Sequence, residues 1–475
     1  MIYLLFIFPF LFIILDLYKK SSSKCIYFLV FLFSCMTHII FYIMLWETIK
    51  KIQIPTFLKI GMIVEFLLFF FCIGIRLNFF PIAKKQIVNF RLRIMMGGRQ
   101  LIFYSLFLFF IQIFLYITSL QLLHNHSFSI GILITDAIIT VLTFFTLFFN
   151  GIFRILCTSK RLNILRRIFI FCTLWIPIFN IFIIWYTCRI VKEEYEHEEF
   201  KVMRTQMRID SQICATKYPI VLVHGIGFRD LKYLNYWRRI PKELIRNGAT
   251  IYYGHQEAWG TIEDNAQAIK EKILSIIQET DCEKVNIIAH SKGGLDSRYM
   301  ISKLHMENYV ASLTTMSTPH RGTKLMDFIS HLPEGIYQKL AKIINQAFTK
   351  IGDKNPDSYK ASMQLTTDFA KKFNETIKNI PQVYYQSYTS VLKNVFSDSL
   401  LFIPYCIMKK LEGENDGLVG IESAKWGNFK GVFRNKYRRG ISHADMIDLK
   451  IEDYKGFDII EKYVEIVSQL KEMGF

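Results

Sequence analysis

Six long apolar runs occupy the first 190 residues of this 475-residue chain. A helix needs roughly 20 apolar residues to cross a bilayer, so five of the runs are long enough and the first is marginal. The first run lacks a preceding basic residue and a small-residue cleavage site, so we expect a retained span rather than a signal peptide. Together they predict an all-α bundle of about six transmembrane helices over residues 1–190. The runs are Met1–Tyr18, Cys25–Trp46, Phe57–Ile75, Leu101–Leu120, Ile130–Phe153 and Ile168–Cys188.

Basic residues between the runs predict an orientation. Lys and Arg are concentrated in the first, third and fifth loops, whereas residues 121–129 between the fourth and fifth runs contain neither. Basic loops stay in the cytoplasm, so six spans would leave both termini and the second half of the chain outside. Lys50 and Lys51 weaken this pattern. Loss of one span from the count would reverse the orientation.

The charge distribution favours a lipid partner over a nucleic acid. The formal net charge is +18, and residues 1–210 carry 22 Lys and Arg against 10 Asp and Glu. Most of the basicity therefore flanks the apolar runs, where it suits anionic headgroups. The second half shows no basic stripe of the kind that binds nucleic acid. Lys59, Glu65 and Asp136 lie in or beside the runs, and we expect them to be paired or near an interface.

The second half has the pattern of a parallel sheet covered by helices. A charged segment, residues 191–215, precedes it and predicts a stalk or linker. From Tyr218 onward, short apolar runs alternate with amphipathic segments, which indicates an α/β domain over residues 216–475. The predicted strands are Ile220–Val223, Ala249–Tyr253, Val285–Ala289, Ser312–Met316 and Val383–Tyr388. The predicted helices are Ile262–Glu279, Leu295–Leu304 and Phe457–Lys471.

Ser291 lies between a predicted strand and a predicted helix, flanked at two positions on either side by Ala289 and Gly293. A serine at a tight strand-to-helix turn needs small residues there, because larger side chains would collide with neighbouring elements. The pattern is A-x-S-x-G, so it departs from the usual G-x-S-x-G at its first small position. A serine beside glycine is, by itself, more often a turn or helix cap than a nucleophile.

Three further features fit a serine nucleophile. The first strand ends in His224-Gly225-Ile226-Gly227, where a hydrolase of this architecture places an oxyanion-binding amide. We expect the backbone N–H groups of Ile226 and Lys292 to be those donors. An acid and then a histidine should follow the serine in the chain. The acid candidates include Asp398, Asp416 and Asp445, and the histidines are His305, His320, His331 and His443. Asp416 in a turn and His443 in a loop before the last helix have the expected order and positions.

The chain from Tyr218 to its end resembles the bacterial triacylglycerol lipases, which are α/β hydrolases. The segments that carry the resemblance cover Pro219–Gly227, Ala289–Gly294, Ser317–Gly322, Asn415–Val419 and Ser442–Asp445. The resemblance implies an α/β hydrolase fold with Ser291 as nucleophile, His443 as base and Asp416 as the acid that orients it. These are the residues that the pattern itself favours.

The same resemblance implies two additional features. One is a structural calcium ion beside the catalytic histidine, for which Asp445 and Asp398 match the two acidic ligands; no cofactor is needed for the chemistry itself. The other is a lid or a fixed cap, which would correspond to an insertion over residues 323–380 that includes an amphipathic helix at Gly335–Lys350.

We therefore expect a membrane-anchored serine ester hydrolase, a lipase that cleaves acylglycerol esters through an acyl-enzyme. Its partners would be membrane lipid and an ester lipid substrate. Three alternatives stay open on the sequence. A phospholipase or a lipid acyltransferase would use the same triad, and a transporter or sensor would use the hydrolase-like domain only to bind lipid.

Overall fold

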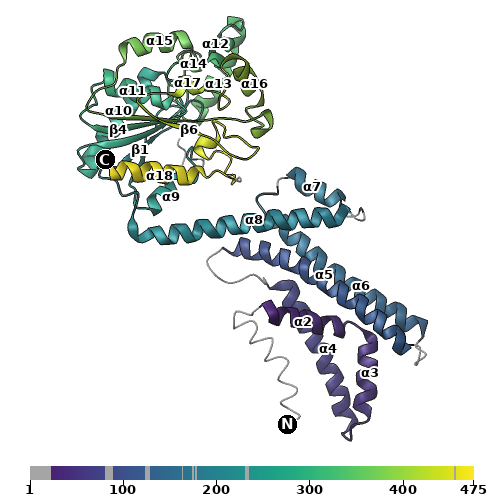
Figure 1. The fold of residues 1–475 in the computed structure, drawn as a ribbon. Coiled ribbons are helices and arrows are strands. Elements are labelled where there is room, and N and C mark those ends of the chain that lie inside the picture. The colour runs from purple at the N-terminus through teal and green to yellow at the C-terminus, as the bar shows by residue number, and fades with distance from the viewer. Residues whose placement is uncertain are drawn as a thin grey trace. The chain divides into compact units, whose positions relative to one another are not determined.

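The computed structural model describes residues 23–80, 89–123, 129–162, 164–173, 176, 179–229, 235–453 and 456–475. The chain forms two compact units, Met1–Arg204 and Thr205–Phe475 (Figure 1). The first unit is helical, and the second is built around a parallel sheet. The α/β hydrolase architecture predicted for the second half is confirmed.

The described part of the first unit holds fewer candidate spanning helices than the six that the sequence predicts for the whole region. Within the described residues, three helices are long and apolar enough to cross a membrane, and the pair α2 and α3, bent by 81°, would make a fourth if it counted as one broken span. The run Met1–Tyr18 lies outside the described residues. The run Ile168–Cys188 is divided between two helices, with Pro177 in the sequence between them, and proline is unfavourable inside a helix. The helices are α2 (Ser23–Met36), α3 (Ile39–Lys50), α4 (Thr56–Phe79), α5 (Phe90–Leu123), α6 (Ile130–Thr158), α7 (Ile164–Thr173) and α8 (Phe179–Arg208).

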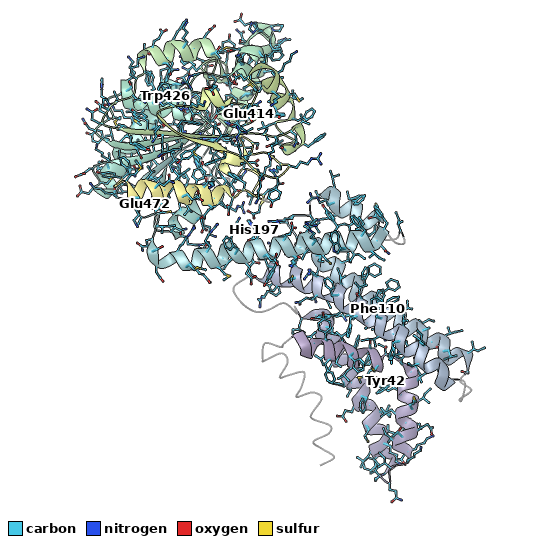
Figure 2. All side chains as sticks on the ribbon, viewed as in Figure 1. Tyr42, Phe110, His197, Glu414, Trp426 and Glu472 are labelled. Atoms are coloured by element: carbon cyan, nitrogen blue, oxygen red, sulfur yellow. The ribbon has the colours of Figure 1, made fainter. Side chains whose placement is uncertain are left out.

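Helices α5 and α6 approach each other closely at a pair of glycines. A Cβ atom on Gly98 would lie 2.7 Å from the carbonyl oxygen of Gly151, and one on Gly151 would lie 2.8 Å from that of Gly98. Small residues allow this approach in membrane helices, where close packing replaces the hydrophobic effect as the source of association. Apolar side chains such as Phe110, 67% exposed, cover the outer surface (Figure 2).

Asp136 is fully buried and paired, as predicted. Its carboxylate lies 2.9 Å from His38 Nδ1 and accepts hydrogen bonds from Tyr116 Oη at 2.7 Å and from the N–H of Ile39. His38 and Ile39 lie at the bend where α3 begins. A carboxylate at this point satisfies a free helical N–H and complements the positive end of the helix dipole.

The second unit contains six parallel strands in the order β2-β1-β3-β4-β5-β6. Five were predicted, within two residues at each end. The sixth was missed because it is a partly exposed edge strand with a glycine and alternating polar residues, so it lacks a continuous apolar signal. The strands are β1 (Ile220–Val223), β2 (Ile251–Tyr253), β3 (Val285–His290), β4 (Val310–Met316), β5 (Tyr384–Ser390) and β6 (Asn428–Phe433).

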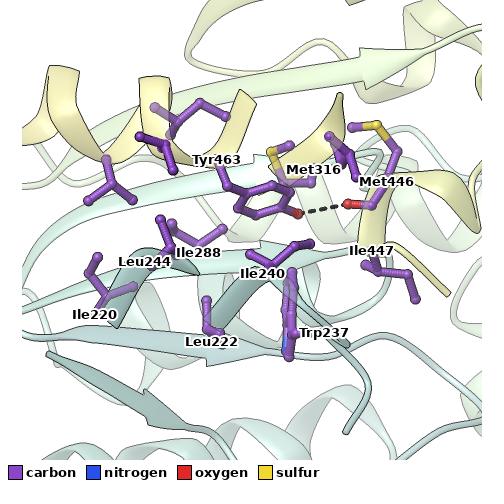
Figure 3. Close-up of a cluster of buried hydrophobic side chains, with 14 of the residues drawn as sticks. Ile220, Leu222, Trp237, Ile240, Leu244, Ile288, Met316, Met446, Ile447 and Tyr463 are labelled. Atoms are coloured by element: carbon purple, nitrogen blue, oxygen red, sulfur yellow. Dashed lines mark hydrogen bonds between the residues drawn. The ribbon is translucent and has the colours of Figure 1, made fainter. Parts of the chain in front are cut away.

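Alternate residues of the strands face two separate apolar clusters. In β1, Ile220 and Leu222 pack with residues of α9 and α18, whereas Val221 and Val223 pack with residues of α10 and α11. Figure 3 shows the first cluster, in which Tyr463 Oη donates to the carbonyl oxygen of Met446 at 3.0 Å. The sheet is thus covered on both faces. The covering helices are α9 (Ile240–Arg246), α10 (Ile262–Thr280), α11 (Gly293–Lys303) and α18 (Ile459–Glu472).

The connection from β4 to β5 carries the predicted helical insertion (Figure 1). Its longest helix exposes apolar side chains, among them Ile336 at 53% and Ile343 at 63%. The insertion contains α12 (Lys324–Ser330), α13 (Glu334–Ile351), α14 (Ser358–Met363) and α15 (Thr367–Thr376). Two short helices follow β5, α16 (Phe402–Leu411) and α17 (Ile421–Ala424). The 3-10 turns are η1 (Ile209–Ser211), η2 (Val395–Ser397) and η3 (Asp445–Ile447).

Replacing Tyr463 with phenylalanine should lower the free energy of unfolding of the second unit by about 1 kcal/mol, because the buried carbonyl of Met446 loses its donor. Urea unfolding, monitored by tryptophan fluorescence, would measure this loss of stability, because the centroid of the Trp237 ring lies 6.0 Å from that of Tyr463. The control is Tyr309→Phe, at a site 37% exposed to solvent. An equal loss in both variants would contradict the assignment.

Candidate active site

Ser291 lies at a sharp turn between β3 and α11. Its φ is +54°, a left-handed conformation that is uncommon for residues other than glycine. Its N–H donates to the carbonyl oxygen of Met316, the last residue of β4, at 3.0 Å. The serine is 8% exposed. A strained backbone at the carboxyl end of a central strand is the arrangement that presents a nucleophilic hydroxyl above the sheet.

The small residues around Ser291 are required to different degrees. A Cβ on Gly293 would overlap the carbonyl oxygen of His224 and lie 2.8 Å from that of Val223, so this position accepts only glycine without rearrangement. Ala289 is fully buried and pairs in register with Val223 and Thr315, with its methyl group in the apolar cluster beneath α10 and α11. The first small position therefore accommodates alanine.

His443 and Asp416 are brought together as the sequence predicts. His443 Nδ1 lies 2.8 Å from Asp416 Oδ2, and the His443 N–H donates to the Asp416 carbonyl oxygen at 2.8 Å. The other carboxylate oxygen of Asp416 accepts the N–H groups of Leu418 and Val419 at 3.0 and 2.8 Å. Both side chains are at least 90% buried. A carboxylate so held keeps the Nδ1 of the imidazole protonated and leaves Nε2 free to accept a proton.

The residue before Ser291, His290, is in direct contact with His443, which places the serine near that histidine. The ring of His290 is 4.4 Å from the ring of His443, measured between centroids, and its Nδ1 lies 2.7 Å from Tyr236 Oη. The hydrogen bonds among the described residues do not include one between Ser291 Oγ and His443. Contacts of this kind commonly tighten only when substrate binds. Burial, assisted by the neighbouring His443, holds the pKa of His290 well below its usual range, so this ring is neutral.

The two expected oxyanion donors belong to Lys292, directly after the serine, and to Ile226, in the loop that packs on the serine. Gly225 packs directly on Ser291, since a Cβ on the glycine would be 2.8 Å from that of the serine. Gly227, with φ +81°, closes the turn through a hydrogen bond from its N–H to Ala258. Within the described part of the chain, neither the Ile226 nor the Lys292 N–H donates to another backbone group. Both donors are thus available to an oxyanion.

Several side-chain contacts of the site were not predicted from the sequence. Lys292 Nζ forms an ion pair with Asp296 Oδ1 at 2.6 Å, with both side chains 1% exposed. Burial raises the pKa of Asp296, and Lys292 only partly offsets this effect. The i,i+4 spacing was the available signal for this pair, but the predicted helix began only at Leu295 and so left Lys292 outside it. No sequence signal connected Tyr236 with His290, because the contact joins a loop to a distant strand.

The two expected calcium ligands lie next to the histidine loop, but their surroundings do not fit a calcium ion. Asp398 Oδ2 is paired with Lys450 Nζ at 2.7 Å, and Asp445 Oδ1 with Arg439 Nη2 at 2.9 Å. Asp445 Oδ2 accepts the N–H of Ser442 at 2.9 Å. Calcium takes six to eight oxygen ligands. The described residues contain no cluster of three or more His, Cys, Asp or Glu that would hold a metal ion.

Known proteins match this chain over its second half. The family model for palmitoyl protein thioesterase matches residues 219–393. Triacylglycerol lipase 2 of Saccharomyces cerevisiae is 30% identical over 277 residues, which cover 52% of this chain and 77% of the yeast protein. A triacylglycerol lipase of Vibrio cholerae is 29% identical over 286 residues, covering 54% of this chain and 89% of that protein. The crystal structure of a Bacillus licheniformis lipase in mature form is 22% identical, covers 53% of this chain and 92% of its own, and has a TM-score of 0.40.

Replacing Gly225 with alanine should slow the labelling of Ser291 by a fluorophosphonate about 100-fold. The new methyl group would displace the serine or the adjoining loop, and small misplacements in such sites have effects of that size. Gly61→Ala is a matched control, because nothing lies within 4 Å of its added Cβ. Equal labelling of the two variants would show that the loop does not position the serine.

Proposed function

This chain belongs to the triacylglycerol lipase family of α/β hydrolases and is a carboxylic ester hydrolase, and we propose that it is a membrane-anchored lipase that cleaves acylglycerol esters through an acyl-enzyme on Ser291. The observation that carries the proposal is the buried hydrogen bond between His443 and Asp416 beside the strained serine turn. A neutral imidazole held in this tautomer is the base that a serine hydroxyl needs.

In the proposed mechanism, Ser291 Oγ attacks the ester carbonyl while His443 Nε2 takes its proton. Asp416 stabilises the resulting imidazolium through Nδ1–H, and the Ile226 and Lys292 amides bind the oxyanion. His443 then protonates the leaving alkoxide, which departs as the alcohol. Water, deprotonated by the same imidazole, attacks the acyl-enzyme and releases the fatty acid. An acyltransferase would differ only in using a second alcohol in place of water.

The preference for a lipid ester is supported by apolar surface on the second unit. Helix α13 exposes Ile336, Leu340 and Ile343, and the segment around α16 exposes Phe396 and Ile403 at 81% and 66%. Exposed apolar side chains of this size suit contact with acyl chains. The end of α13 is joined to the body through Asp353, which pairs with Arg229 at 2.9 Å. This supports α13 acting as a lid with one fixed end.

The contacts of helix α8 are relevant to the question of which side of the membrane the hydrolase lies on. Glu194, 2% exposed, accepts hydrogen bonds from Ser159 Oγ at 2.6 Å and from Arg91 Nη1 at 2.7 Å. It also accepts the N–H groups of Lys160 and Arg161. Arg91 is at the start of α5, and Ser159 directly follows α6. The chain at Glu194 has therefore returned to the end of the α5–α6 pair from which α7 departs.

We infer from this contact that α7 and the first half of α8 do not cross the membrane, because a crossing would separate Ser159 from Glu194 by about 30 Å. The shared end is the basic one, whereas residues 119–129 at the other end have no Lys or Arg. The positive-inside rule then supports a hydrolase unit on the cytoplasmic side. This differs from the outside location that a count of six spans implied.

Ser291→Ala should reduce hydrolysis of emulsified triacylglycerol about 10⁴-fold or more, because the acyl-enzyme can no longer form. Free fatty acid and acylated acceptor alcohol would be measured together with the purified full-length protein, which separates hydrolysis from acyl transfer. Phosphatidylcholine serves as the competing substrate. Ser297→Ala, which replaces a buried serine on the helix that follows Ser291, is the control for the substitution itself. Unchanged turnover in Ser291→Ala would refute the proposed mechanism.

The accessibility of inserted epitope tags to antibody tests which side of the membrane the hydrolase unit lies on. A tag after Phe475 should bind antibody only in permeabilised cells, and a tag inserted at Asn125, in the segment without basic residues, should bind it in intact cells. The two tags in otherwise identical proteins control for each other. Staining of the Phe475 tag in intact cells would place the hydrolase outside.

A further inference from the structure

The loop that carries His443 is held by two buried carboxylates and a serine. Asp445 Oδ2 accepts the N–H of Ser442, and the Asp445 N–H donates to Ser442 Oγ at 3.1 Å. On the other side of the loop, the N–H of Gly440 donates to Ser397 Oγ at 3.0 Å, directly before Asp398. Asp398 and Asp445 are 2% and 4% exposed. The position of the imidazole therefore depends on where these two carboxylates lie.

Two like charges buried side by side need compensation. Removing one partner of a buried ion pair is strongly unfavourable, because the remaining charge has lost its water. Asp398 and Asp445 are close enough to repel each other electrostatically, and Lys450 attracts both. Lys450, 18% exposed, reaches Asp398 Oδ2 at 2.7 Å, and Arg439 reaches Asp445 Oδ1 at 2.9 Å. Each carboxylate thus has its own cation from the chain.

Lys450 occupies the place where a divalent ion would have to bind. An ammonium at 2.7 Å from Asp398 Oδ2 excludes a calcium ion from that oxygen, since calcium would coordinate it at about 2.3–2.6 Å and the two cations would repel. Arg439 is held in turn by Glu452, 2.8 Å from its Nη1, which keeps the guanidinium directed at Asp445. The two basic side chains supply the positive charge that a metal ion would otherwise bring.

We propose that Lys450 and Arg439 are positioning residues that take the place of a bound divalent cation, so that the His443 loop is held and the hydrolase works without calcium. This rests on the proposed role of His443 as the base. The cations come from residues close in sequence to the loop they hold, so the site is complete as soon as the domain folds. It would operate in a compartment with little free calcium.

The test measures ester hydrolysis by the full-length protein in detergent, with excess EGTA or with millimolar calcium chloride. Wild-type kcat should be the same in both. Lys450→Ala should lower kcat about 10- to 100-fold in EGTA with little change in KM, because the base is misplaced rather than the substrate site altered. Added calcium should restore part of the lost kcat in this variant, since Asp398 without its lysine is a carboxylate able to bind a divalent cation in the place of the ammonium. Lys450→Arg, which keeps the charge, should retain activity in EGTA.

Lys462→Ala removes a surface lysine paired only with Glu465 and should match wild type under both conditions. A wild-type protein that loses activity in EGTA and regains it with calcium would overturn the inference, as would a folded Lys450→Ala variant fully active in EGTA. If Lys450→Ala does not fold, the wild-type response to EGTA and the activity of Lys450→Arg decide the question. The proposed function fails separately, through an active Ser291→Ala variant.

Discussion

The close approach of Gly293 to the end of β1 is the contact on which the catalytic half of this protein depends. Because no side chain separates them, the first turn of α11 lies against the carbonyl oxygens of Val223 and His224. Next to this contact, Ser291 adopts a left-handed conformation and the Gly225 loop packs directly on it. The expected nucleophile and the two expected oxyanion donors thus belong to backbone segments that pack closely together, so their positions do not depend on flexible side chains.

Three buried carboxylates around the candidate active site are each paired with a cation from within the chain. Lys292 is paired with Asp296 below the serine, and Asp398 and Asp445 have Lys450 and Arg439 beside the histidine loop. A buried ion pair adds little to stability compared with apolar packing, but it fixes geometry, since moving either partner leaves a charge unsolvated. In a catalytic site, fixed geometry is worth more than additional stability, because the rate depends on the orientation of the base.

The proposed cytoplasmic location of the hydrolase and its proposed independence of calcium are consistent with each other. Glu194, in the middle of α8, joins that helix to the basic end of α5 and α6. A hydrolase on the cytoplasmic side would meet little free calcium, and the lysine beside Asp398 makes a calcium ion unnecessary.

The sequence by itself determined the elements and the chemistry. Five strands, the helical insertion and the expected triad could be predicted without coordinates, because the signals for them are local in the sequence. These signals are the periodicity of the strands, the small residues around Ser291, and the chain order of Asp416 and His443. Apolar length identified α4, α5 and α6 for the same reason. The edge strand β6 was not predicted, because a half-exposed strand has no strong pattern of apolar residues.

Only the tertiary structure decided how distant charges are paired. Asp398 pairs with Lys450 because two loops, separated by about fifty residues in the sequence, come together. The hydrogen bond between Glu194 and Ser159 likewise decides whether the run Ile168–Cys188 can cross the membrane. Spacing along the chain contains no information on such contacts. They arise because a buried carboxylate must find a positive charge or N–H donors in three dimensions, and the fold selects which ones are within reach.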